Sequence, residues 1–145
     1  MKVNLISSFQ LPFNMTNIWN LHIGSRGHRE IFEGTKTVEG RVTDPSNPEK
    51  DYSKMLPGDI VNFIPVVGER DDPPLLDALS LSFIVGSNKK YSSVRELLEA
   101  EGLENVWPGV KTIEEGIEIY HSSLGYEEKI ERHGIYAIKL DERIE

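Results

Sequence analysis

A proline-free segment, Thr35 to Val42, most constrains how this chain folds. Its β-branched residues favour a strand, and successive side chains of a strand point to opposite faces of a sheet. On this alternation Val38, Gly40 and Val42 share one face, which is apolar or small and is expected to meet the core. Gly40 also lets a neighbouring group approach the backbone closely.

The opposite face of the same segment is polar. Glu39 and Arg41 are two apart, so a carboxylate and a guanidinium lie side by side, with Lys36 at the start of the strand. One interpretation is an ordinary ion-paired cluster on a half-exposed sheet. In the other, Lys36 and Arg41 hold a phosphate or a base edge, while Glu39 orients them or acts as a base.

The predicted elements run in the order strands, then helices, then a final strand. That order favours an α+β fold with a largely antiparallel sheet. Strands are expected at Lys2–Leu11, Leu21–Ile23, Thr35–Val42, Ile60–Val67, Leu79–Val85 (with an extension to Tyr91 as a bulged hairpin) and Ile135–Leu140. The proline-rich stretch between residues 43 and 57 and the acidic stretch between residues 68 and 74 are expected to be loops.

Start and stop signals mark the helices. Ser25 is expected to cap a short helix that runs through Phe32, and Gly34 stands where a helix end takes a left-handed residue. The patterns Ser93-x-x-Glu96 and Thr112-x-x-Glu115 are capping boxes and predict two further helices. A last helical piece is expected at residues 126 to 132.

Composition narrows the class of protein. The chain has 145 residues, which fits one domain, and a net charge of -8, which argues against tight nonspecific binding to a phosphate backbone. The charge is uneven. Residues 1 to 54 hold seven Lys or Arg against six acids, so the remaining residues carry -9. A polyanionic ligand is therefore expected at the N-terminal half.

The sequence excludes cysteine chemistry, and it predicts neither a membrane span nor a metal site. The chain has no cysteine, so disulfides and thiolate chemistry are absent, and a reducing cytoplasmic location is the simpler expectation. No apolar run reaches the 18 residues of a membrane span. The four histidines show no ligand spacing, so no metal and no cofactor are expected; they are His22, His28, His121 and His133.

Gly34 to Arg41 reads G-T-K-T-V-E-G-R, and it resembles the G-x-K-x-x-E-x-R signature of ASCH domains, members of the PUA-like superfamily. Three later stretches resemble the same family: K-M-L-P-G-D-I-V-N-F at 54–63, a stretch at 101–120 that contains P-G-x-x-T-x-E-E-G-x-x-x-Y, and G-I-Y-A-I-K-L at 134–140. Together the four pieces cover roughly residues 21 to 140 in the family's order.

The resemblance implies a PUA-like mixed β-barrel with flanking helices and a cleft lined by Lys36, Glu39 and Arg41. Family members are thought to bind RNA, and a few are enzymes, among them an acetylcytidine amidohydrolase, whose matching lysine is catalytic, and a ribonuclease. If this protein is an enzyme, Lys36 is expected to act as base or nucleophile, with Glu39 as its proton partner. The chain departs from the amidohydrolase at Glu39, where that enzyme has a threonine.

Three further residues are candidates for ligand contact. Arg26 and Arg29 are three apart, so on a helix they share a face just before the signature, and that face is either simply solvated or able to reach a phosphate. Tyr120 lies on an apolar helical stripe and is either core or cleft-lining. Tyr120-His121-Ser122 has no predictable Asp partner for a catalytic triad.

These observations lead to one principal hypothesis and two rivals. The principal one is a single ASCH domain that binds RNA or a nucleotide-like small molecule through Lys36, Glu39 and Arg41, and whose oligomeric state is open. The first rival is a hydrolase acting on a modified nucleoside, or a ribonuclease. The second is a protein-interaction module, which the acidic C-terminal half favours.

Overall fold

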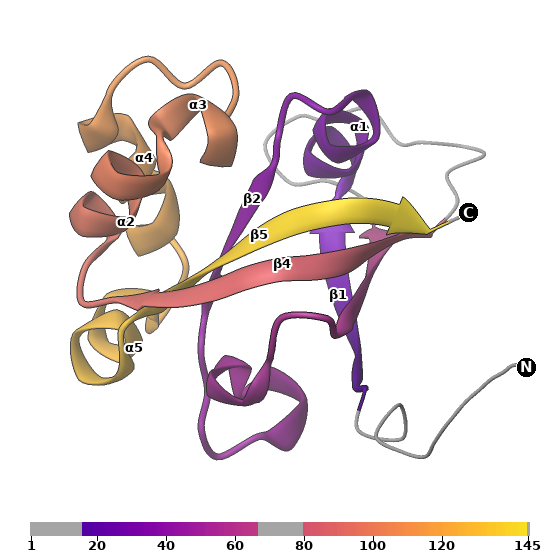
Figure 1. Cartoon of the computed structure of the whole chain (residues 1–145). Coiled ribbons are helices and arrows are strands. Elements are labelled where there is room, and N and C mark those ends of the chain that lie inside the picture. Colours follow the sequence, from indigo (N-terminus) through magenta and orange to yellow (C-terminus); the bar gives the residue numbers. More distant parts are fainter. Residues whose placement is uncertain (1–15, 67–79, 145) are drawn as a thin grey trace, which may run out of the picture.

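The computed structural model describes residues 16–66 and 80–144. They form an α+β fold around a curled, half-barrel sheet of five strands in the order β1-β3-β4-β5-β2 (Figure 1). The strands are β1 (Ile18–Gly24), β2 (Val38–Val42), β3 (Ile60–Val66), β4 (Leu81–Tyr91) and β5 (Ile135–Ile144). The α+β prediction is confirmed in this coarser form.

Helices gather at the two ends of the long β4–β5 pair. The helix α1 (Ser25–Glu33) lies with β1 and β3 at one end, and the other four helices lie at the opposite end (Figure 1). These are α2 (Val94–Glu101), α3 (Leu103–Val106), α4 (Ile113–His121) and α5 (Tyr126–His133). Two 3₁₀ turns, η2 (Pro48–Lys50) and η3 (Tyr52–Lys54), fill the stretch expected to be a loop.

Pairing within the sheet departs from a purely antiparallel pattern. β1 runs parallel to β3, whereas the other three neighbouring pairs are antiparallel. β4 is one continuous strand with two register shifts near Val85, and it pairs with β5 across the inserted helices. The predicted extension to Tyr91 and the bulges are confirmed, and β4 pairs antiparallel both with β3, which precedes it, and with β5, which comes more than 40 residues later in the chain.

Local signals predicted most helix ends correctly. The Thr112–Glu115 capping box is confirmed, and the N–H of Gly34, in the left-handed region at φ 84°, bonds to the end of α1. At α2 only half of the box forms: Ser93 caps, but the Glu96 carboxylate accepts from Ser92. The Ser25 cap was wrong, because Ser25 is the first residue of α1 and its side chain is buried.

Two apolar clusters fill the two faces of the sheet. One lies inside the half-barrel and includes Leu21, Val61 and Phe63. The other lies under the helices and includes Val38, Leu97 and Ile135. Because both faces are covered, the half-exposed sheet considered for residues 38–42 is not what forms.

Four of the predictions lie wholly or partly outside the described residues. They are the strand at Lys2–Leu11, the acidic loop at 68–74 and the ends of two other predicted strands (Val67, Leu79).

A buried carboxylate secures the turn before β3. The Asp59 carboxylate accepts from the Trp19 indole Nε1 at 3.0 Å, the Leu56 amide at 2.9 Å and the Asn17 amide at 3.3 Å. Replacing Asp59 with alanine removes the acceptor and leaves these donors without it. We therefore expect a loss of about 3 kcal/mol in the free energy of unfolding. Urea unfolding measures this loss, and Asp141→Ala on the exposed part of β5 should change stability by less than about 0.5 kcal/mol. Equal effects of the two changes would contradict the assignment.

None of the helices in the described part of the chain is long and apolar enough to span a membrane.

Candidate functional site

Lys36, Glu39 and Arg41 form one connected ionic cluster. The Lys36 Nζ lies 3.1 Å from Glu39 Oε1, and the Arg41 Nε lies 2.7 Å from Glu39 Oε2. Each oxygen of the carboxylate thus faces its own cation. The sequence predicted that Glu39 and Arg41 share a strand face, and the structure brings Lys36 to the same carboxylate.

The chain reaches this arrangement through a tight exit from α1. After Gly34, the Thr35 and Lys36 amides both bond to the Glu30 carbonyl, and the Thr35 hydroxyl does so as well. The Thr37 amide then bonds to the Asn105 carbonyl, so β2 begins only at Val38 rather than at the expected Thr35. This turn directs the Lys36 side chain into the protein.

Burial gives the cluster its electrostatic character. Lys36 is 3% exposed and Glu39 is 7% exposed, while the Arg41 side chain keeps 21% of its surface accessible. Burial raises the pKa of Glu39, but the neighbouring Lys36 and Arg41 lower it more, so it stays below its ordinary range. The carboxylate is therefore ionised at neutral pH, and two cations around one anion leave a net charge of +1.

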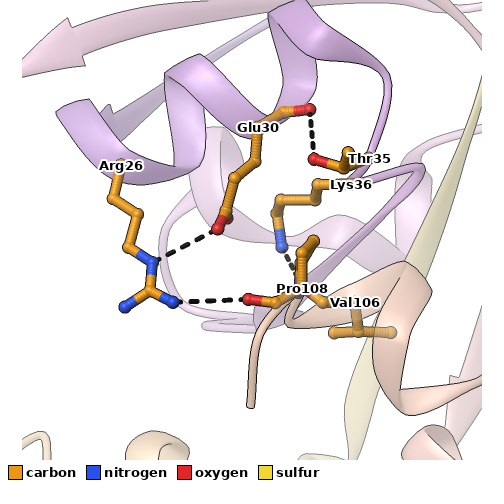
Figure 2. A network of polar contacts seen from close by, with 6 residues as sticks. All are labelled: Arg26, Glu30, Thr35, Lys36, Val106 and Pro108. Carbon is orange, nitrogen blue, oxygen red and sulfur yellow. Dashed lines mark hydrogen bonds and ion pairs between the residues drawn. The ribbon is translucent and has the colours of Figure 1, made fainter.

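Lys36 is anchored to the helical part of the molecule. Its ammonium donates to the Val106 carbonyl at the end of α3 and lies 4.8 Å from the centre of the Trp107 ring. Arg26, on α1, donates from Nη2 to the Pro108 carbonyl at 3.3 Å (Figure 2). Arg26 on α1 and Lys36 just after α1 therefore both donate to the same short segment, residues 106–108.

Arg41 is anchored to the opposite edge of the sheet. Its Nη2 donates to the His22 carbonyl on β1 at 2.8 Å, and β1 and β2 are the two edge strands. This side chain therefore bridges the opening of the half-barrel. Burial lowers the pKa of Arg41, but the Glu39 carboxylate raises it more, and the pKa ends above its ordinary value.

Tyr120 lies in the core of the helical cluster, next to the ionic cluster. Its ring is buried against Trp107, with ring centroids 5.5 Å apart, and its hydroxyl lies against the backbone of Gly40. Burial, followed by the Glu39 charge, raises the pKa of the Tyr120 phenol well above its ordinary value. The hydroxyl is therefore neutral, and the burial agrees with the core role considered for Tyr120.

Arg26 and Arg29 end up in different surroundings. Arg26 pairs with Glu30 at 3.2 Å as well as with Pro108, which fixes its guanidinium beside the 106–108 segment (Figure 2). Arg29 is partly buried, and no ion pair joins it to another side chain of the described residues. The structure thus brings Arg26, but not Arg29, into the polar network around Lys36.

The surface has two pockets that none of the three cluster residues lines. The first, of about 700 Å³, lies between Arg26, the 109–111 loop and α4. The second, of about 500 Å³, lies between the 43–46 loop and α5. Sequence reasoning missed Trp107 as a partner of Lys36, and it missed Lys111 and Glu118 as pocket residues, since exposed charges on a loop and a helix carry no signal of their own. Within the described ranges, no group of His, Asp or Glu is placed to hold a metal ion.

No family model and no curated protein sequence matches the chain. Two solved structures are similar over most of its length. The crystal structure of hypothetical protein PH0355 is 34% identical, covers 88% of this chain and 99% of its own, and has a TM-score of 0.67. The solution NMR structure of protein PF0455 from Pyrococcus furiosus is also 34% identical, covers 88% and 98% respectively, and has a TM-score of 0.62.

Proposed function

This chain belongs to the protein family that contains PH0355 and PF0455, and we propose that it is a PUA-like protein of the ASCH type that binds RNA or a nucleotide-like ligand. The observation that carries the proposal is the buried cluster of Lys36, Glu39 and Arg41, with its net charge of +1. The whole molecule carries -8. A positive centre in an acidic protein attracts an anion to one place rather than to the whole surface.

Arg41 is the member of the cluster that meets the ligand. Its side chain is the most exposed of the three, and Glu39 together with the His22 carbonyl holds its plane in a fixed orientation. A planar guanidinium in a fixed orientation binds a phosphate or a base edge through two parallel hydrogen bonds. Glu39 orients this fork, and Lys36 keeps Glu39 in place from the buried side.

Binding is favoured over hydrolysis by the state of Glu39. Its two oxygens already accept from Lys36 and Arg41, and its lowered pKa makes it a weak base, so it is poorly suited to take a proton from an attacking water or hydroxyl. Incubation with acetylcytidine and with single-stranded RNA, followed by mass analysis of the products, tests the hydrolase and ribonuclease alternatives. Turnover that disappears in Lys36→Met would replace the binding proposal with an enzymatic one.

Replacing Arg41 with alanine is expected to weaken RNA binding about tenfold, because one charge-assisted contact to phosphate or base is lost. Fluorescence anisotropy with a labelled single-stranded RNA at several salt concentrations measures the change. The slope of log affinity against log salt concentration should also become shallower by about one, which corresponds to one lost phosphate contact. Arg41→Lys keeps the charge without the fork and should recover part of the affinity.

The matched control is Arg95→Ala. Arg95 is an exposed arginine on α2 that pairs with Glu99 and Glu114, away from the cluster. Its removal should leave RNA affinity within about twofold of the unchanged protein, because it contributes only to the distant field. Circular dichroism confirms that each variant is folded. If Arg41→Ala binds RNA as well as Arg95→Ala does, the cluster is not the binding site.

A further inference from the structure

The first pocket has the dimensions of a small-molecule site. Its volume of about 700 Å³ falls inside the range of roughly 300 to 1,000 Å³ that is typical of ligand sites. Three separate parts of the chain build it: α1, the loop at 109–111 and α4. The residues that line it are Arg26, Gly109, Val110, Lys111, Glu115, Glu118, Ile119, His121 and Ser122.

One wall of this pocket carries positive charge in a prepared position. The Arg26 guanidinium is held by Glu30 at 3.2 Å and by the Pro108 carbonyl at 3.3 Å (Figure 2). Gly109, at φ 86°, turns the chain beside it, and a Cβ at that position would lie only 3.2 Å from Arg26 Nη2. The glycine therefore keeps room beside the guanidinium. Lys111, in the 109–111 loop, adds a second cation to the pocket, and this one is exposed.

The α4 wall carries a hydrogen-bond acceptor of opposite charge. Glu118 and His121 are three apart on α4, so they share the helix face that lines the pocket. Glu115 is already used, since its carboxylate accepts from the amides of Lys111 and Thr112. Glu118, in contrast, forms no ion pair with another side chain of the described residues. It is the carboxylate left to meet a ligand.

The lining between the two walls is partly apolar. Val110 and Ile119 are half-buried and offer a surface on which a flat ring can lie. A ligand that suits all three features has an anionic group, a planar apolar body and a hydrogen-bond donor on the far edge of that body. Carboxylate side chains accept hydrogen bonds from exocyclic amino groups of nucleobases, as they do with cytosine N4.

We propose that this pocket binds a single nucleotide whose base carries an exocyclic amino group. The phosphate lies toward Arg26 and Lys111, the base lies on Val110 and Ile119, and its amino group donates to Glu118. Uracil places a carbonyl where cytosine has its amino group, so it faces the Glu118 carboxylate with an acceptor and is disfavoured. The inference rests on the proposed function because both assume a nucleotide ligand, but it concerns a different set of residues.

Titration of the four mononucleotides CMP, AMP, GMP and UMP, followed by NMR shifts or calorimetry, tests the proposal. CMP is expected to bind about tenfold more tightly than UMP, the usual effect of one hydrogen bond to a charged group. Glu118→Gln should reduce that preference to about twofold or less. Lys111→Ala should weaken all four nucleotides together, because it removes charge at the phosphate and leaves the base contact intact.

The control variant is Glu114→Gln, a carboxylate on the same helix whose side chain faces Arg95 instead of the pocket. It should leave both affinity and base preference unchanged. Equal affinities for CMP and UMP, or a preference that survives Glu118→Gln, would overturn the inference. If Arg41→Ala loses RNA binding but the unchanged protein shows no base preference, only the pocket proposal is rejected and the proposed function stands. A Glu118-dependent preference in a protein that binds no RNA would support the pocket and reject the RNA-binding role proposed for the cluster of Lys36, Glu39 and Arg41.

Discussion

Replacing Glu39 with glutamine is expected to remove about 3 to 5 kcal/mol from the free energy of unfolding. Such a loss is typical when one partner of a buried ion pair is deleted and the other charge stays buried. Here the substitution leaves two cations without the carboxylate that they share, because Lys36 Nζ at 3.1 Å and Arg41 Nε at 2.7 Å both form ion pairs with Glu39. For a domain with an ordinary stability of about 5 to 15 kcal/mol, that is a large fraction. Chemical denaturation followed by circular dichroism measures it.

A second substitution separates the charge effect from a packing effect. Lys36→Met in the Glu39→Gln background removes the more deeply buried of the two orphaned cations, so it should recover part of the lost stability. The control is Glu99→Gln, an exposed acid that lies 3.9 Å from Arg95 and should cost less than about 0.5 kcal/mol. A double variant that is less stable than Glu39→Gln alone would mean that Lys36 is held by Val106 and Trp107 rather than by Glu39.

The effect of Glu39→Gln on stability should depend on pH. Because the folded pKa of Glu39 lies below its ordinary value of 4.5, the ionised carboxylate stabilises the fold above that pH. This contribution is lost as the pH falls through the lowered folded value. The stability difference between the unchanged protein and Glu39→Gln should therefore be largest near neutral pH and shrink below about pH 4. A difference that stays constant to pH 3 would contradict the assignment.

Replacing Gly40 with alanine is expected to cost about 3 kcal/mol, at the upper end of the usual range for overpacking a core. An added Cβ would lie 2.1 Å from the Tyr120 hydroxyl oxygen and 2.9 Å from Cζ. The tyrosine cannot simply swing away, because its ring is buried and packs against Trp107. Thermal or urea unfolding of Gly40→Ala measures the cost.

The test of this cause is a double-mutant cycle with Tyr120→Leu. A leucine has no atoms where the phenol meets Gly40, so Gly40→Ala should cost about 1 kcal/mol or less in that background. Gly86→Ala is the matched strand control, since its added Cβ comes no closer than 3.3 Å to another atom. If Gly40→Ala costs the same with and without Tyr120, the glycine is needed for some other reason.

The ion-paired and the functional interpretations of the cluster are compatible in this structure. Lys36 and Glu39 are buried and tie the sheet to the segment at 106–108, which is a structural role. Arg41 extends the same network to the accessible opening between the two edge strands. An arginine held in place by a buried carboxylate would suit the phosphate contact that we propose for Arg41.

Local chemistry in the sequence by itself determined several elements. The β-branched residues around Val38 predicted β2, Gly34 predicted the end of α1, and the Thr112–Glu115 pair predicted the start of α4. Each of these signals acts between residues a few positions apart, through side-chain alternation, left-handed backbone or capping hydrogen bonds. The same alternation correctly placed Glu39 beside Arg41.

Only the tertiary structure decided what surrounds those elements. The parallel pairing of β1 with β3, the contact of Lys36 with the Val106 carbonyl, and the bond from Arg41 to the His22 carbonyl all join residues far apart in the chain. The acceptors in the last two are backbone carbonyls, which every residue has, so no residue type marks them in advance. Burial of both sides of β2, and with it the electrostatics of the cluster, follows from packing that the local pattern does not contain.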